Sequence, residues 1–301
     1  MGNYMNSKES VQKAISVTEP FAIFSDSHVK VIKFLTYITS LYSVAVRAVD
    51  LHLAEVEAIN TGVKLPQENN TNRVFDIEEK VTFVEEIQKD LWNVIMLTED
   101  ESYIAELLLC RIVESFLAYL SDLLILIFKT KPEILRSTKT EQLEFILQFQ
   151  TMEELIAALS EKKANELAYQ SLTDISKYFE DKLGLPIFDT VEAKELTCTL
   201  SEIRNVIVHA RGTITSIFKK RLPNYSGEIG GKIALNLSEV AEHTDFLARL
   251  ALNLDNQASS KFNLIKQPID SSLEEVEYIQ RNVAAFPEVS ERLFRPISGK
   301  E

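Results

Sequence analysis

Apolar positions recur at helical spacing in the first hundred residues. They predict one helix from an N-cap near Ser25 to Thr61, and a second helix over residues 75–97. The polar segment 66–72 separates the two as a loop. The run Thr98–Ser102 interrupts the second pattern. We therefore expect a soft domain boundary near residue 100.

From residue 103 onward the pattern is that of a helical bundle, punctuated by stops such as Pro132 and Gly184. The alternation over 232–237 predicts a short strand or one arm of a small hairpin near 229–237, followed by Ser238 as an N-cap. We expect five bundle helices, the second broken near Gln150–Thr151: 103–129, 140–161, 164–182, 191–221 and 238–258.

These elements predict an all-α protein in three parts. Residues 1–100 form an N-terminal helical region of unassigned role, and residues 101–258 form the bundle of about five helices. Residues 259–301 form a C-terminal tail with one short helix near 271–284. We expect the tail to pack on the bundle or on a partner.

Composition narrows the class of protein further. The chain has 301 residues with only eight Gly and eight Pro, which disfavours barrels, sandwiches and Gly-rich nucleotide loops. Its two cysteines, Cys110 and Cys198, form no CxxC pair, so we expect reduced, buried thiols in a cytoplasmic protein. Residues 1–19 contain no apolar secretory segment. The apolar stretch 107–128 contains Arg111, Glu114 and Asp122, which favours a buried helix over a membrane span.

The segment Glu202–Gly212 carries the candidate chemistry. An apolar stripe of spacing 4, 3, 4, 3, 4 defines the core side of its helix: Leu196, Leu200, Ile203, Ile207, Ala210 and Ile214. At about 100° per residue, Arg204 and Arg211 lie on the flank of that stripe. Asn205 and His209 point away from the core, with Glu202 beside them and Val208 on the same outward arc. A second copy of the helix would cover such a face.

Charge is distributed unevenly around this segment. The net charge is −13, which argues against a general nucleic-acid binder. No acidic residue occurs between Glu202 and Glu228, however, and this interval holds five cations that would contact phosphate: Arg204, Arg211, Lys219, Lys220 and Arg221. For residues 219–221 the alternative is a helix C-terminus stabilised by cations.

The pattern Arg204-Asn205-x-x-x-His209 resembles the Arg-x(4–6)-His signature of the HEPN superfamily of helical ribonucleases. The resemblance runs from about residue 103 to residue 255 and includes the helix 111–122. It departs from the family where Ala210 replaces a frequent Asn. Arg211 stands where toxins silenced by nucleotidyltransferase partners have Tyr, so we do not expect that mode of control.

The resemblance implies metal-independent endoribonuclease activity with no cofactor. The 2′-OH would attack the adjacent phosphorus, leaving a 2′,3′-cyclic phosphate and a 5′-OH. His209 would exchange protons, Arg204 would stabilise the phosphorane oxygens, and Asn205 would orient the imidazole or hold the phosphate. We expect Glu114 and Glu202 to contact these residues and hold them in position, without touching the substrate.

The resemblance also implies a homodimer that shares a composite site. It suggests a toxin or antiphage effector, controlled by a regulatory, antitoxin or defence-complex partner and not bound to a membrane. Two alternatives remain open at this stage. The bundle would be either a non-catalytic scaffold or dimerisation subunit, or a nucleotide-sensing module.

Overall fold

The computed structural model describes residues 16–61, 77–136 and 140–268, and the side chains of residues 16–41, 101–136 and 140–268. The described residues are mostly helical, so the all-α prediction is confirmed. Within these ranges, every helix lacks the length or the apolar composition required to span a bilayer. The stretch 107–128 lies in a helix with a buried face, as expected.

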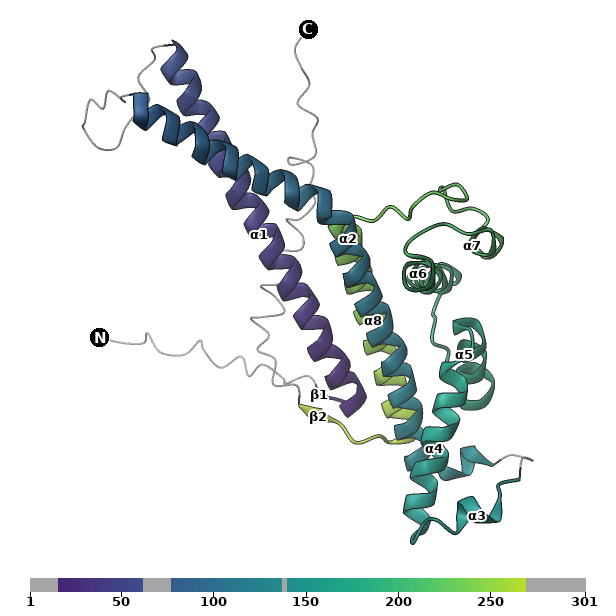
Figure 1. Cartoon of the computed structure of the whole chain (residues 1–301). Coiled ribbons are helices and arrows are strands. Elements are labelled where there is room, and N and C mark those ends of the chain that lie inside the picture. Colours follow the sequence, from purple (N-terminus) through teal and green to yellow (C-terminus); the bar gives the residue numbers. More distant parts are fainter. Residues whose placement is uncertain (1–15, 62–76, 137–139, 269–301) are drawn as a thin grey trace, which may run out of the picture.

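Two long helices, α1 (Glu19–Thr61) and α2 (Ile77–Thr130), run antiparallel as a hairpin (Figure 1). The helix α1 begins six residues before Ser25, so the prediction of an N-cap at Ser25 is wrong. Pro20 is tolerated in a first helical turn because it lacks an N–H that would have no helical partner there. The side chains of Phe21 and Phe24 are buried against Tyr119 of α2, which extends the packed face to the start of α1.

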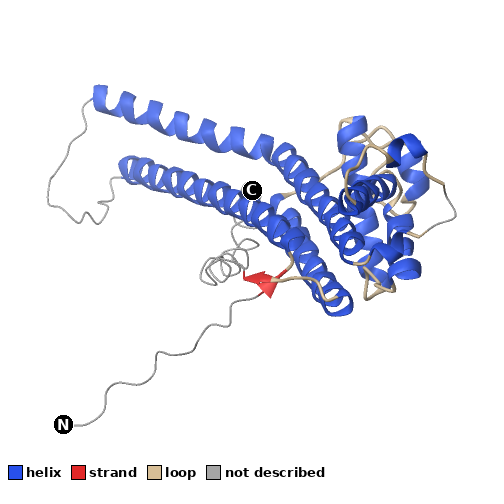
Figure 2. Ribbon diagram, turned by 90° about the horizontal axis from the view of Figure 1, so that it is seen from below, coloured by secondary structure: helices blue, strands red, loops and turns tan. Residues whose placement is uncertain are grey.

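The helix α2 runs without interruption through Thr98–Ser102, so the predicted helix break there is wrong. The ribbon does change direction about midway along α2 in both views (Figures 1 and 2). The polar side chain of Glu101 accepts a hydrogen bond from the backbone N–H of Leu237 at 3.1 Å. Glu101 therefore joins α2 to the start of α8, while Leu35 of α1 shares one core with Leu109 of α2.

Four of the remaining helices, η1, α4, α6 and α8, pack on the second half of α2 (Figure 1). α8 lies beside α2 and α1, and α4 and α6 pack on α2 from the other side. The helices after α2 are η1 (Pro132–Leu135), α3 (Leu143–Ile146), α4 (Met152–Ala168), α5 (Leu172–Tyr178), the π-helical turn η2 (Phe179–Leu183), α6 (Val191–Ala210), α7 (Ser216–Arg221) and α8 (Leu237–Phe262).

Several helix boundaries differ from the predicted ones. The break near Gln150–Thr151 is confirmed, because the Thr151 hydroxyl caps α4 by accepting from the N–H of Glu154 at 3.1 Å. α4 then continues to Ala168, so the division expected between 161 and 164 is wrong. The next helix begins after Ser171, whose hydroxyl accepts from the N–H of Asp174.

The start of α8 also differs from the prediction. Asn236, not Ser238, is its N-cap, and it forms a reciprocal capping box with Glu239. At the other end α8 reaches Phe262, four residues beyond the predicted end of the bundle. The Tyr119 hydroxyl of α2 donates to the Ala251 carbonyl of α8 at 3.1 Å and joins the two helices inside the core.

The hairpin predicted near 229–237 does not form in the described structure. A single antiparallel bridge joins Thr213 to Lys232 instead. The two short strands that do form are β1 (Ser16–Val17) and β2 (Gln267–Pro268), which pair antiparallel near the ends of the described chain (Figure 2). The tail helix predicted at 271–284 lies outside the described residues.

Candidate functional site

The helix α6 carries the motif and ends earlier than predicted. Thr190 caps its first turn, and Leu200, Ile203 and Val206 are buried on its inner face. The prediction of one helix over 191–221 is wrong, because α6 ends at Ala210 and α7 follows after a short turn. Ile214, the last residue of the predicted apolar stripe, is buried, but it lies in that turn and not in α6.

The turn after α6 favours glycine at position 212. The N–H of Gly212 donates to the carbonyl of Val206 at 3.1 Å, and both Arg211 and Gly212 adopt left-handed backbone conformations. A Cβ at Gly212 would lie 2.9 Å from a carboxylate oxygen of Glu106 on α2. This stop places His209 in the last turn of α6.

The guanidinium of Arg204 is held in a fixed orientation. Its Nη2 donates to Glu114 Oε1 at 2.7 Å, and its Nη1 donates to Asn205 Oδ1 at 3.0 Å. Its Nε is buried without a hydrogen-bond partner among the described residues. Glu114 of α2, predicted to support the site, therefore contacts Arg204 directly. Arg111, in contrast, donates to Ser27 of α1.

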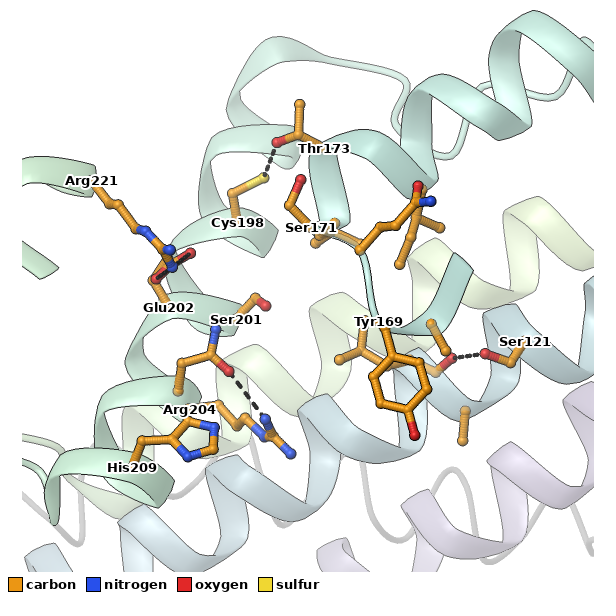
Figure 3. A pocket seen from close by; sticks show the side chains of 17 residues that line it. Ser121, Tyr169, Ser171, Thr173, Cys198, Ser201, Glu202, Arg204, His209 and Arg221 are labelled. Carbon is orange, nitrogen blue, oxygen red and sulfur yellow. Dashed lines mark hydrogen bonds and ion pairs between the residues drawn. The ribbon is translucent and has the colours of Figure 1, made fainter. Parts of the chain in front are cut away.

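His209 is exposed, in agreement with the predicted outward face. Its ring makes no hydrogen bond or ion pair with the described residues. Val208 beside it is also exposed, with 48 % of its surface accessible. Figure 3 shows the imidazole of His209 next to the guanidinium of Arg204. An exposed imidazole and an oriented guanidinium thus lie near the same end of one helix.

These side chains line a cavity of about 590 Å³ between α2, α6 and the connection from α4 to α5. Five of the nine predicted site residues contribute to its wall: Glu202, Arg204, Asn205, His209 and Arg221. Glu114 does not line the cavity, but it contacts Arg204, which does. Tertiary packing therefore gathers most of the motif around one hollow.

Three of the predicted phosphate-binding residues do not line this cavity: Arg211, Lys219 and Lys220. The exposed Arg211 ends α6 in a left-handed conformation. Lys219 donates to the backbone carbonyls of Pro223 and Tyr225, at 3.5 and 2.5 Å. These carbonyls lie beyond the end of α7. Lys219, Lys220 and Arg221 all lie in the last turn of α7, which is the position that the alternative of a helix C-terminus stabilised by cations requires.

Both arginines of the cavity wall are paired with carboxylates. Arg221 Nη1 contacts the two carboxylate oxygens of Glu202 at 3.0 and 2.9 Å, and Arg204 is paired with Glu114. All four side chains are partly exposed. Such pairs contribute roughly 1 kcal/mol or less in water, so an incoming anion can displace the carboxylates.

Residues from three other segments complete the cavity, and no motif in the sequence relates them to α6. Ser121 comes from α2, and Tyr169, Gln170, Ser171 and Thr173 come from the connection between α4 and α5 and the first turn of α5. Figure 3 shows Tyr169 and Ser121 on the opposite side of the hollow from His209. Only the packing of α4 and α6 on α2 brings these residues to one site.

The two cysteines are free thiols that are partly buried, less so than expected. Burial raises the pKa of Cys110 to about 11, and the negative charge of Glu114 adds to the shift. Cys110 is therefore protonated at neutral pH and is not a nucleophile there. Cys198 lines the cavity, with its Sγ 3.8 Å from Thr173 Oγ1.

In the part of the chain that the structure describes, no three His, Cys, Asp or Glu side chains are grouped so that they could hold a metal ion. Comparisons of the chain with protein-family models, with curated proteins and with solved structures gave no match.

Proposed function

We propose that this chain is an endoribonuclease of the HEPN type, which cleaves RNA without a metal ion. The observation that carries the proposal is the position of Arg204, Asn205 and His209 on the wall of one cavity, with Arg204 oriented by Glu114. A scaffold would not require an oriented arginine and an accessible histidine at a polar hollow.

The proposed reaction is a transesterification within the RNA strand. The 2′-oxygen loses its proton and attacks the adjacent phosphorus, and the bond from phosphorus to the 5′-oxygen breaks. The 5′-oxygen takes up a proton, which leaves a 2′,3′-cyclic phosphate and a 5′-OH. An imidazole suits these proton transfers at neutral pH, and no described residue forms a hydrogen bond with the ring nitrogens of His209.

Arg204 would stabilise the charge that develops on the phosphorane oxygens. The guanidinium is planar, permanently charged and able to donate two parallel hydrogen bonds to phosphate. In the resting protein Glu114 accepts one of these donors at 2.7 Å. The phosphate would take the place of this carboxylate, while Asn205 keeps the guanidinium in position.

We further propose that the site is completed by a second copy of the chain. One motif supplies one histidine, whereas the reaction needs one proton acceptor and one proton donor. Val208 and His209 are exposed at the end of α6, where the partner's α6 would lie. In the homodimer, one His209 would act as base and the partner's His209 as acid.

A biological role follows from this activity. We propose a cytoplasmic toxin or antiphage effector, kept inactive by a regulatory partner until RNA cleavage is required. The net charge of −13 suits a nuclease that does not bind RNA over its whole surface.

One observation favours a second candidate, a non-catalytic scaffold or dimerisation subunit. Both arginines of the cavity wall are neutralised by carboxylates of the same chain, Glu114 and Glu202. A site that no longer binds phosphate would show the same pairing. Measurement of RNA cleavage separates the two candidates.

The test is RNA cleavage by the purified chain in the presence of EDTA. Wild type is expected to release fragments with 2′,3′-cyclic phosphate and 5′-OH ends, and His209→Ala and Arg204→Ala to lose at least about a hundredfold in rate. Arg249→Ala is the control, because this exposed arginine lies on α8 away from the cavity. Loss of cleavage in EDTA, or full activity of His209→Ala with an unchanged fold, would contradict the proposal.

A further inference from the structure

Tyr169 is an aromatic side chain that the fold leaves in solvent at the edge of the cavity. It follows the last turn of α4, and 94 % of its surface is exposed. Burial of an aromatic ring normally stabilises a fold by a few kcal/mol. Because Tyr169 is exposed, it does not provide this stabilisation. The other exposed aromatic side chains in the described ranges are Phe34, Tyr37 and Tyr103, and none of them lines the cavity.

The surroundings of Tyr169 differ from those of His209. The cavity residues near it in the sequence and across the hollow are uncharged, and they include the polar Gln170, Ser171 and Ser121. The side chain of Gln170 has no hydrogen-bond partner among the described residues, and that of Ser201 on α6 has none either. In Figure 3 the ring of Tyr169 lies on the far side of the hollow from His209 and Arg204. The cavity therefore has a charged end and an aromatic, neutral end.

We infer that the aromatic end is a subsite for an unpaired nucleobase of the RNA substrate, which stacks on the ring of Tyr169. A nucleobase offers a flat π face to the ring and donors and acceptors along its edge, where Gln170 would bind. The cavity volume of about 590 Å³ lies within the range of roughly 300–1,000 Å³ found for small-molecule sites. This inference rests on the proposed function, which places a phosphate at the end with Arg204.

The subsite defines the substrate class as single-stranded RNA. A base within a duplex is stacked on both faces and paired along its edge, so it presents neither to a protein side chain. A base in a loop or a single strand is free to occupy the hollow. Tyr169 thereby acts as a specificity-determining residue, with no part in the proton transfers.

The experiment measures binding separately from cleavage. A short single-stranded RNA with 2′-O-methyl groups cannot be cleaved by 2′-OH attack, and fluorescence anisotropy gives its Kd for each variant. Tyr169→Ala is expected to weaken binding about tenfold or more, whereas Tyr169→Phe, which keeps the ring, binds within about twofold of wild type. Tyr103→Ala is the matched control, since Tyr103 is also exposed but lies outside the cavity. The duplex form of the same RNA is expected to bind equally to wild type and to Tyr169→Ala.

The outcomes distinguish this inference from the proposed function. Equal single-strand affinity of wild type and Tyr169→Ala, or an equal loss in Tyr103→Ala, overturns the nucleobase subsite even where cleavage is observed. Absence of any single-strand binding overturns it as well. Absence of cleavage together with Tyr169-dependent binding overturns the ribonuclease proposal and leaves the subsite standing.

Discussion

Arg204 and Glu114 are 90 residues apart in the sequence and form an ion pair of 2.7 Å between α6 and α2. The pair sets the direction of the guanidinium and at the same time neutralises it. Any phosphate that binds Arg204 must compete with this carboxylate. The contact thus links the assembly of the bundle to the availability of the site.

Glu114→Gln is expected to strengthen RNA binding. Glutamine keeps the hydrogen-bond acceptor for Arg204 but removes the negative charge, so the guanidinium is oriented and no longer neutralised. A partly exposed pair contributes roughly 1 kcal/mol or less, which corresponds to an improvement in Kd of about two- to fivefold for 2′-O-methyl RNA at low salt. Asp245→Asn is the control, because it removes the partner of Arg249 on α8 away from the cavity and should leave the Kd unchanged. Weaker binding by Glu114→Gln would show that the carboxylate positions Arg204 and does not compete with phosphate.

Arg211→Gly is expected to stabilise the protein. Arg211 ends α6 with a φ of 53°, a conformation that costs a residue with a Cβ about 1 kcal/mol more than glycine. Thermal or urea unfolding should show that gain for glycine, and no gain for Arg211→Ala, which keeps the Cβ. Since Arg211 does not line the cavity, the cleavage rate should remain within about twofold of wild type. A large loss of cleavage would restore Arg211 to the RNA-binding surface predicted from the sequence.

Asp255→Ala is expected to destabilise the protein by about 3 kcal/mol. The Asp255 carboxylate on α8 is fully buried and accepts hydrogen bonds from both the backbone N–H and the hydroxyl of Thr18, next to β1. Alanine would leave both donors buried without a partner. The control is Asp245→Ala on the same helix, an exposed residue paired with Arg249, which should cost less than about 1 kcal/mol. Equal losses in urea unfolding would show that the contact of Asp255 with Thr18 adds nothing to stability.

His28 is expected to make folding sensitive to mild acid. It is buried beside Phe24, and this burial lowers its pKa to about 4 from 6.5, although the backbone of Thr244 acts in the opposite direction. Between pH 6.5 and pH 4, His28 is therefore protonated in the unfolded chain but not in the folded chain. Stability falls as the pH drops from 6.5 towards 4, by about 3 kcal/mol in total from this residue.

The measurement is the free energy of unfolding of wild type and His28→Leu at a series of pH values. In the difference between the unfolding free energies of the two proteins, the contributions of groups that titrate in both cancel. His28→Leu should gain relative to wild type as the pH falls through this interval, and the difference should be constant above about pH 7. A difference that does not depend on pH would contradict the buried, neutral state of His28.

The long helices show where the sequence pattern failed. The polar run Thr98–Ser102 resembles a loop, yet α2 continues through it, and Glu101 within the run accepts the N–H of Leu237 at the start of α8. That partner lies 136 residues away, so no local pattern reveals it. The early end of α6 could have been predicted from the sequence, because Gly212 directly follows the motif and glycine commonly ends helices.

The sequence by itself determined that the chain is helical and which face of α6 points outward. Periodicity is a local property, and it placed Leu200 and Ile203 inside and His209 and Val208 outside correctly. Only the tertiary structure decided that Glu114 pairs with Arg204 and that Tyr169 faces the same hollow as His209. These relations depend on how α2, α4 and α6 pack against one another. Packing joins segments distant in the chain through contacts that no spacing along one helix encodes.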